Sequence, residues 1–189
     1  KEKRKNNHKY NLLCHRYFMR SLGWGIITAA TIYLASLVLP ENETPWIAFF
    51  IIMLYTLMEI DKRMLLLPDI LTVPLLIVGF SYAVFAGGML GYEPAASAAN
   101  SALGAAAGYV IPVIASLFLI KKYPEAFGGG DIKLLSAVGS WVGLTNIPYV
   151  ILLSCLLFAV SCFINKQRQG AFGPSIVIAS LIILFLSEY

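Results

Sequence analysis

A chain of 189 residues with a net charge of +4 is 59% hydrophobic and only 13% charged. Soluble domains usually carry about 25% charged residues, so this composition excludes an ordinary water-soluble enzyme or binding domain. A bilayer-spanning helix needs about 20 apolar residues, and about seven such helices would use nearly the whole chain.

The first segment is a basic arm, residues 1–21, which contains half of the 14 Lys and Arg residues. We expect this arm to be cytoplasmic, because basic residues that flank spans collect on the cytoplasmic side. The apolar run that follows, Leu22 to Leu39, is too long for the core of a cleaved signal peptide. We therefore interpret it as the first span of a transmembrane domain, residues 22–189.

Six further apolar runs predict the remaining helices of an all-α, polytopic transmembrane bundle with about six to seven spans. The fifth run is short for a span, and we expect it to begin at the membrane interface. We expect a short connection, Thr145-Asn146, before the sixth run. The runs are Pro45 to Ile60, Ile70 to Leu90, Ala95 to Ile120, Ile132 to Leu144, Ile147 to Ile164 and Phe172 to Leu186.

The connections between these runs alternate in charge. If the N-terminus is cytoplasmic, strict alternation places all 14 Lys and Arg residues on the cytoplasmic side, as basic residues near span ends require. The same alternation places three acids, Asp61, Asp69 and Asp131, at the cytoplasmic membrane edge. The acids expected on the external side are Glu41, Glu43, Glu93 and Glu188.

The run Ala95 to Ile120 carries a stripe of small residues that includes Asn100, Gly104 and Gly108. Small residues let two helices approach closely in lipid. We favour packing within the chain for this stripe, while a homodimer contact stays open. Pro74 and Pro112 lie inside predicted spans, where we expect them to bend the helix.

Asp61 and Asp131 each lie where a predicted span meets the cytoplasmic edge. An ionisable group at membrane depth costs several kcal/mol unless it is paired or hydrated, so such a group is a candidate functional residue. Two carboxyl groups that lie close together share a proton, which provides one base and one acid for peptide hydrolysis. The two aspartates could converge if the second and fifth spans pack side by side.

The residues around these aspartates also have structural interpretations. Asp131 could be the N-cap of its helix, and Asp69 could cap the third span. Glu59 could pair with Arg63 four residues later, snorkel, or act as a competing acid. Lys62 and Arg63 are typical of charge anchors at a membrane surface.

We expect no metal and no other cofactor. Cys14, Cys155 and Cys162 form no CxxC pair and suit apolar packing, and the two histidines, His8 and His15, lie in the basic arm.

The three glycines before Asp131 permit backbone conformations and close approaches that other residues do not.

Two motifs on one membrane face resemble the type IV prepilin peptidase family, whose members pair a D-x6-P-D loop with a GxGD motif. The resemblance runs from about Trp46 to the last residue and includes a sequence like the family's last-span motif. The matching residues are Asp61, Pro68 and Asp69, then Gly128, Gly130, Asp131 and Lys133, then Phe172-Gly173-Pro174.

This resemblance implies an aspartic endopeptidase that uses Asp61 and Asp131 to remove the basic leader of type IV prepilin or pseudopilin precursors. Gly128, Gly130, Pro68, Asp69 and Lys133 would support that pair. The implied location is the bacterial cytoplasmic (inner) membrane, and the implied partners are precursor substrates and the lipid bilayer, with no nucleic acid. Larger members carry an N-terminal domain with two CxxC pairs and are similar to N-methyltransferases. The single cysteine before the second span favours a short form without that activity.

The sequence alone also allows other functions. A small proton- or cation-coupled transporter could use Asp61 and Asp131, although its acids would be expected near the bilayer midplane. A presenilin-like protease shares GxGD but expects a Tyr-Asp pair, whereas Ile60 precedes Asp61. A structural assembly subunit would need neither aspartate.

Overall fold

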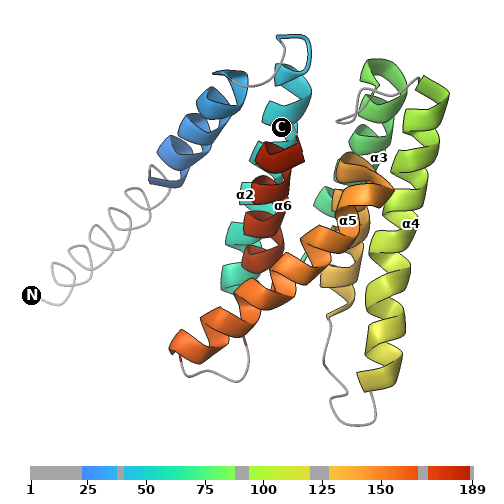
Figure 1. Ribbon diagram of the computed structural model, residues 1–189. Coiled ribbons are helices and arrows are strands. Elements are labelled where there is room, and N and C mark those ends of the chain that lie inside the picture. The colour runs from blue at the N-terminus through green and yellow to red at the C-terminus, as the bar shows by residue number, and fades with distance from the viewer. Residues whose placement is uncertain (1–22, 38–40, 88–93, 120–127, 166–169, 188–189) are drawn as a thin grey trace, which may run out of the picture.

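The computed structural model describes residues 23–37, 41–87, 94–119, 128–165 and 170–187, and in these ranges the chain is a bundle of helices (Figure 1). The expectations for the N-terminal arm, Glu93, Glu188 and the loops with Lys121, Lys122, Lys166 and Arg168 lie outside the described residues. An apolar helix, Gly23–Leu37, precedes the five labelled helices. These are α2 (Thr44–Met64), α3 (Asp69–Ala86), α4 (Pro94–Leu119), α5 (Gly129–Asn165) and α6 (Gly173–Ser187).

Four of these helices, α2 to α5, are long and apolar enough to cross a membrane, and Gly23–Leu37 and α6 are shorter apolar helices. The prediction of an all-α polytopic bundle is therefore confirmed. Pro74 and Pro112 lie inside α3 and α4, as predicted.

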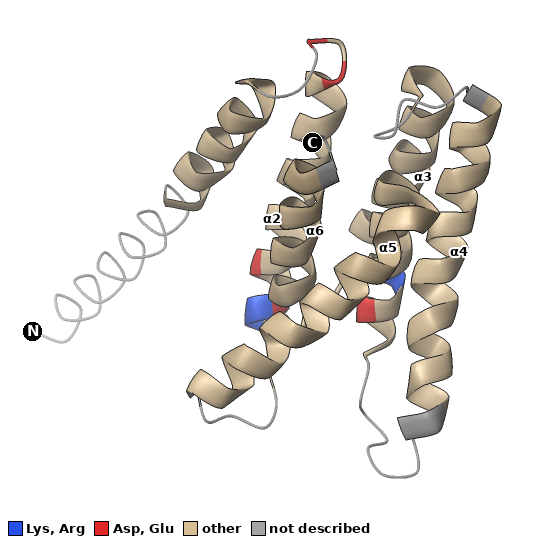
Figure 2. Cartoon of the chain, viewed as in Figure 1, with Lys and Arg blue, Asp and Glu red and all other residues tan. Residues whose placement is uncertain are grey.

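Charged residues separate toward the two ends of the bundle. In Figure 2, the acidic residues of the loop before α2 lie at the upper end, whereas the acidic and basic residues of α2 and α5 lie in the lower half. This arrangement agrees with the alternation of connections that the sequence predicts.

Helix α5 consists of two legs that meet at Gly143. Gly143 has φ 75° and ψ 175°, a conformation that interrupts the helix and is accessible to glycine. In Figure 1 the chain rises to this bend and then descends, so both ends of α5 point toward the lower end of the bundle. The expected connection at Thr145-Asn146 is therefore wrong: both residues are helical, and the turn comes earlier, at a glycine inside an apolar run.

The first leg of α5 is a core helix. Every residue from Leu134 to Gly143 is buried, which is the pattern of a helix surrounded by others rather than by lipid. The leg spans about 21 Å at 1.5 Å per residue, less than the roughly 30 Å hydrocarbon thickness, so the bend lies at membrane depth. Backbone groups at that depth need a partner inside the protein. Asn100 of α4 provides one, because its Oδ1 accepts a hydrogen bond of 2.9 Å from the Leu144 N–H.

The small-residue stripe of α4 packs against this leg. A methyl group at Gly104 would collide with the backbone of Gly139 and Gly143, and one at Gly108 would collide with the backbone of Leu135. Packing within the chain, the favoured interpretation of the stripe, is therefore confirmed for these two glycines.

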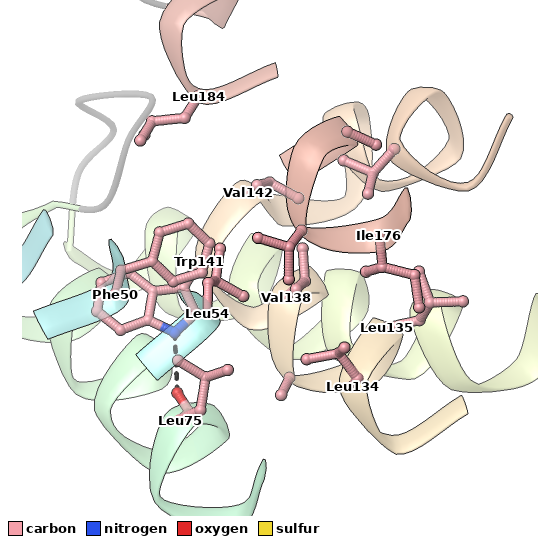
Figure 3. Close-up of a cluster of buried hydrophobic side chains, with 14 of the residues drawn as sticks. Phe50, Leu54, Leu75, Leu134, Leu135, Val138, Trp141, Val142, Ile176 and Leu184 are labelled. Atoms are coloured by element: carbon pink, nitrogen blue, oxygen red, sulfur yellow. Dashed lines mark hydrogen bonds between the residues drawn. The ribbon is translucent and has the colours of Figure 1, made fainter. Parts of the chain in front are cut away.

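Trp141 joins α2, α3 and α5 in the core, and Figure 3 shows it beside Phe50 with its nitrogen hydrogen-bonded to Leu75. Trp141 of α5 stacks on Phe50 of α2 and Tyr82 of α3, with ring centroids 4.7 and 5.5 Å apart. Its Nε1–H donates a 2.8 Å hydrogen bond to the Leu75 carbonyl of α3. This buried cluster sets the relative positions of the three helices whose lower ends carry the aspartates.

Candidate active site

Asp61 lies in the last turn of α2, because this helix continues to Met64, beyond the predicted end at Ile60. The helix ends at Leu65, which has φ 52° and whose N–H donates to the Asp61 carbonyl at 2.9 Å. The Asp61 side chain points inward, and the residue is only 4% exposed. An acid buried to this degree needs polar partners from elsewhere in the fold.

The first residue of α6 provides one of these partners. The Gly173 N–H donates a 2.8 Å hydrogen bond to Oδ2 of Asp61, across 112 positions of sequence. Because Gly173 begins α6, this N–H is one of the donors that a helix cannot satisfy internally. Asp61 thus accepts a hydrogen bond from the start of another helix, an arrangement that favours negative charge.

Asp131 is the third residue of α5, so the interpretation of Asp131 as an N-cap is wrong. Gly128 is the N-cap, since its carbonyl accepts from the N–H groups of Asp131 and Ile132 at 3.0 and 3.3 Å. The Asp131 carboxyl group is half-buried and bonds back to the backbone of Gly128. Gly130, the residue before it, lies against Leu67 of the α2–α3 connection, so Asp131 and Asp61 lie at the same end of the bundle.

The position of Asp61 depends on α6 as well as on its own helix, α2. Helix α6 packs against both of the others, and its first turn meets Asp61 directly. The sequence predicted convergence through side-by-side packing of the second and fifth spans. Those spans do touch through Trp141 and Phe50, but the lower end of α2 is held by α6.

The first and third glycines of the GxGD motif are in tight positions, and the middle one is not. A Cβ atom at Gly128 would lie 2.9 Å from Oδ2 of Asp131, and one at Gly130 would lie 2.9 Å from Cβ of Leu67. A Cβ at Gly129 would meet nothing within 4 Å. Leu67 is buried in the α2–α3 connection, so Gly130 lets this connection lie directly against the start of α5.

Asp69 does not cap α3. It is the first residue of that helix, the N-cap is Pro68, and no side chain caps the end. Both Asp69 carboxylate oxygens instead accept from Lys133 Nζ of α5 at 2.7 Å. The pair lies at the surface, with the two side chains 61% and 50% exposed, and joins the start of α3 to the start of α5.

The charged residues beside Asp61 are paired elsewhere. Glu59 and Arg63 form the predicted i,i+4 ion pair at 2.6 Å. Lys62 Nζ lies 4.7 Å from the ring centroid of Trp24 in the first helix. Of the four charged residues at this end of α2, Asp61 alone is buried against α6.

Gly173 is the site residue that sequence reasoning missed. The sequence Phe172-Gly173-Pro174 resembles the family's last-span motif, but a backbone N–H leaves no side-chain signal that would connect Gly173 to Asp61. The two motif positions that were predicted as support, Asp69 and Lys133, contact each other rather than either acid.

Comparison with known proteins agrees with this geometry. Residues 48–163 match the model of the type IV leader peptidase family. A prepilin leader peptidase/N-methyltransferase of Vibrio cholerae serotype O1 is 30% identical over 89% of this chain and 65% of its own length. Proteins of the same name from Neisseria gonorrhoeae and Xanthomonas campestris pv. campestris are 30% and 42% identical over 71% and 67% of this chain.

The chain spans about half to two thirds of the length of these curated relatives: 65%, 46% and 44% of the three proteins. No solved structure matches the chain. The transporter interpretation finds no support among these relatives. Because the match to the family model covers more than half of its residues, the chain belongs to the type IV leader peptidase family.

Proposed function

We propose that this protein is a membrane aspartic endopeptidase that removes the leader of type IV prepilin or pseudopilin precursors, with Asp61 and Asp131 as its catalytic pair. The observation that carries the proposal is that the start of α5 lies against the α2–α3 connection, which places the two acids, far apart in sequence, at the same end of the bundle. The printed names of the relatives support the substrate class.

The chemistry needs one ionised and one protonated carboxyl group. The ionised group takes a proton from a water molecule, whose oxygen attacks the scissile carbonyl carbon, while the protonated group hydrogen-bonds the carbonyl oxygen. The proton taken from water then passes to the leaving amine as the C–N bond breaks. Two negative charges that approach each other repel, so the mechanism would have the pair share one proton.

The position of the pair suits a substrate cut beside the membrane. Both acids lie at the end of the bundle that carries Lys62, Arg63 and Lys133, which we assign to the cytoplasmic face of the bacterial inner membrane. The apolar helix of the precursor would lie in the lipid beside the spans and present its leader at this edge. Gly128, Gly130 and Pro68, together with the Asp69–Lys133 pair, would hold the connection and the helix start that frame the site.

One chain is sufficient for this site. Both acids come from the same copy, and Gly104 and Gly108 of the stripe are already covered by α5. A homodimer is therefore compatible with the proposal but contributes nothing to the pair.

Coexpression with a prepilin precursor, followed by measurement of the size change on a gel, tests the proposal. The wild type should convert the precursor to the shorter mature form, and Asp61→Asn and Asp131→Asn should not. Glu59→Gln, on the same helix and paired to Arg63, is the matched control and should cleave. Normal cleavage by both aspartate variants would refute the peptidase proposal, and ion flux through proteoliposomes would then test the transporter alternative.

A further inference from the structure

The start of α6 offers one N–H donor to the site and no other. Phe172 is the N-cap, and its carbonyl accepts from the N–H groups of Ser175 and Ile176 at 3.0 and 3.2 Å. Pro174 has no N–H, as is common in the first turn of a helix. Among residues 173–176, Gly173 alone has an N–H that points away from its own helix, and this N–H binds Asp61.

The same position has no space for a side chain. A Cβ atom at Gly173 would lie 2.6 Å from Oδ2, 3.0 Å from Cγ and 3.1 Å from Cβ of Asp61. An alanine at this position would therefore have to displace either the carboxyl group or the start of α6. A Cβ atom at Gly170, three residues earlier, would meet only Phe158, at an ordinary contact distance of 3.9 Å.

The start of α6 is also held in place independently of Asp61. The Phe172 ring packs edge-on against Phe158 of α5, with centroids 5.2 Å apart. Helix α6 contains no Asp, Glu, Lys or Arg from Gly173 to Ser187, so it meets Asp61 through its backbone rather than through an ion pair. The position of the donor is thus set by packing against α2 and α5.

We propose that Gly173 is a positioning residue for the peptidase reaction. Its peptide N–H fixes Oδ2 of Asp61 and leaves Oδ1 for the attacking water and for the proton shared with Asp131. Each residue of Phe172-Gly173-Pro174 then has a role: Phe172 anchors the helix start, Gly173 makes room for Asp61 and donates, and Pro174 adds no competing donor. This inference rests on the proposed function, because it acts through Asp61.

Kinetics of the purified full-length protein on a prepilin substrate test the inference. Gly173→Ala should lower kcat by about 100-fold or more, since displacing a catalytic group by about 1 Å has effects of this size. KM should change by no more than about twofold, because substrate binding is left in place. Gly170→Ala, the matched control, should keep the wild-type kcat.

A thermal-unfolding cycle separates this contact from a general packing defect. Gly173→Ala should lower Tm markedly less in the Asp61→Ala background than in the wild-type background, because only the 3.1 Å contact with Cβ of residue 61 remains there. A second variant removes the donor without adding an atom: glycolic acid in place of Gly173, introduced by ligating a synthetic C-terminal segment. This ester should lower kcat about tenfold, the effect of losing one hydrogen bond to a charged group.

A wild-type kcat in both the alanine and the ester variants would overturn the inference, as would an equal Tm loss in both backgrounds. If Gly173→Ala does not accumulate in the membrane, the kcat of the ester variant alone decides whether Gly173 positions Asp61. Failure of the wild type to cleave, or normal cleavage by Asp61→Asn, would instead refute the proposed function, and the Tm cycle would still decide whether Gly173 holds Asp61.

Discussion

Two aspartates flank the α2–α3 connection, Asp61 and Asp69. Asparagine substitution at each should show that Asp61 takes part in catalysis and that Asp69 only helps to hold the helices in place. Asp61→Asn keeps the size of the side chain and an oxygen that can accept from Gly173, but it removes the group that exchanges a proton. Asp69→Asn removes the charge that binds Lys133 and leaves the catalytic pair unchanged. We expect the first variant to be inactive and the second to remain active.

The exposure of the two sites sets the expected magnitudes. The Asp69 and Lys133 side chains are 61% and 50% exposed, and exposed ion pairs contribute about 0–1 kcal/mol. Even if the whole of this energy were lost in the transition state, kcat/KM would fall only about fivefold. Asp61 is 4% exposed and belongs to a pair that acts as a unit, so its loss should cost on the order of 10⁴-fold or more. Asp131→Asn should match Asp61→Asn, and the double variant should be little worse than either.

Initial rates of prepilin cleavage over a dilution series of purified enzyme would resolve both effects in one assay. Equal Tm values for wild type and Asp61→Asn would show that lost activity is not lost folding. The reasoning would be refuted if Asp69→Asn lowered the cleavage rate as much as Asp61→Asn does. If Asp61→Asn were active while Glu59→Gln was dead, the first acid would have been assigned two residues too late.

Four further predictions concern topology, cofactors, packing and the hydrogen bond at the α5 bend. In a cysteine-free background, Asn42→Cys should react with a membrane-impermeant thiol reagent from outside the cell and Met64→Cys should not; the reverse pattern would contradict a cytoplasmic site. Chelators should leave cleavage intact, and activity lost to a chelator and restored by one metal would show that a metal is required. Gly104→Val should destabilise the protein by about 1–3 kcal/mol through overpacking, while Gly25→Val, in open space, should not, as measured by unfolding in mixed detergent. Asn100→Ala should cost about 1–3 kcal/mol in the same assay, because it leaves the amide at the α5 bend without an acceptor.

Much of the fold follows from the apolar runs, because a lipid environment demands continuous helices and permits few alternatives. The predicted run Ala95 to Ile120 corresponds to α4, Pro94–Leu119, and the other helix ends fall within a few residues of prediction. The bend of α5 could not be placed in this way. Gly143 looks like any other position in an apolar run, and its left-handed conformation depends on α4, more than 40 residues earlier in the chain.

The candidate site was predictable to the extent that its chemistry lies in side chains. Asp61 and Asp131 stand out because acids are costly beside lipid, and both lie at the same end of the bundle. Capping preference led to the wrong role for Asp69, since Lys133 offers it a full charge within reach. The contact of Asp61 with Gly173 joins residues 112 positions apart through a backbone group, and no local pattern records such a pair.

The bend at Gly143 has a consequence for how the protein is made. The first leg of α5 is too short to cross the bilayer. At the bend, the N–H of Leu144 donates to Asn100 of α4 instead of to its own helix. Helix α4 is translated first, so the acceptor is already in the membrane when the two legs of α5 leave the ribosome. The helix that carries the acceptor, Asn100, therefore precedes the helix that carries the donor, Leu144, along the gene. A permuted gene that delivered α5 before α4 would leave this amide exposed to lipid during insertion.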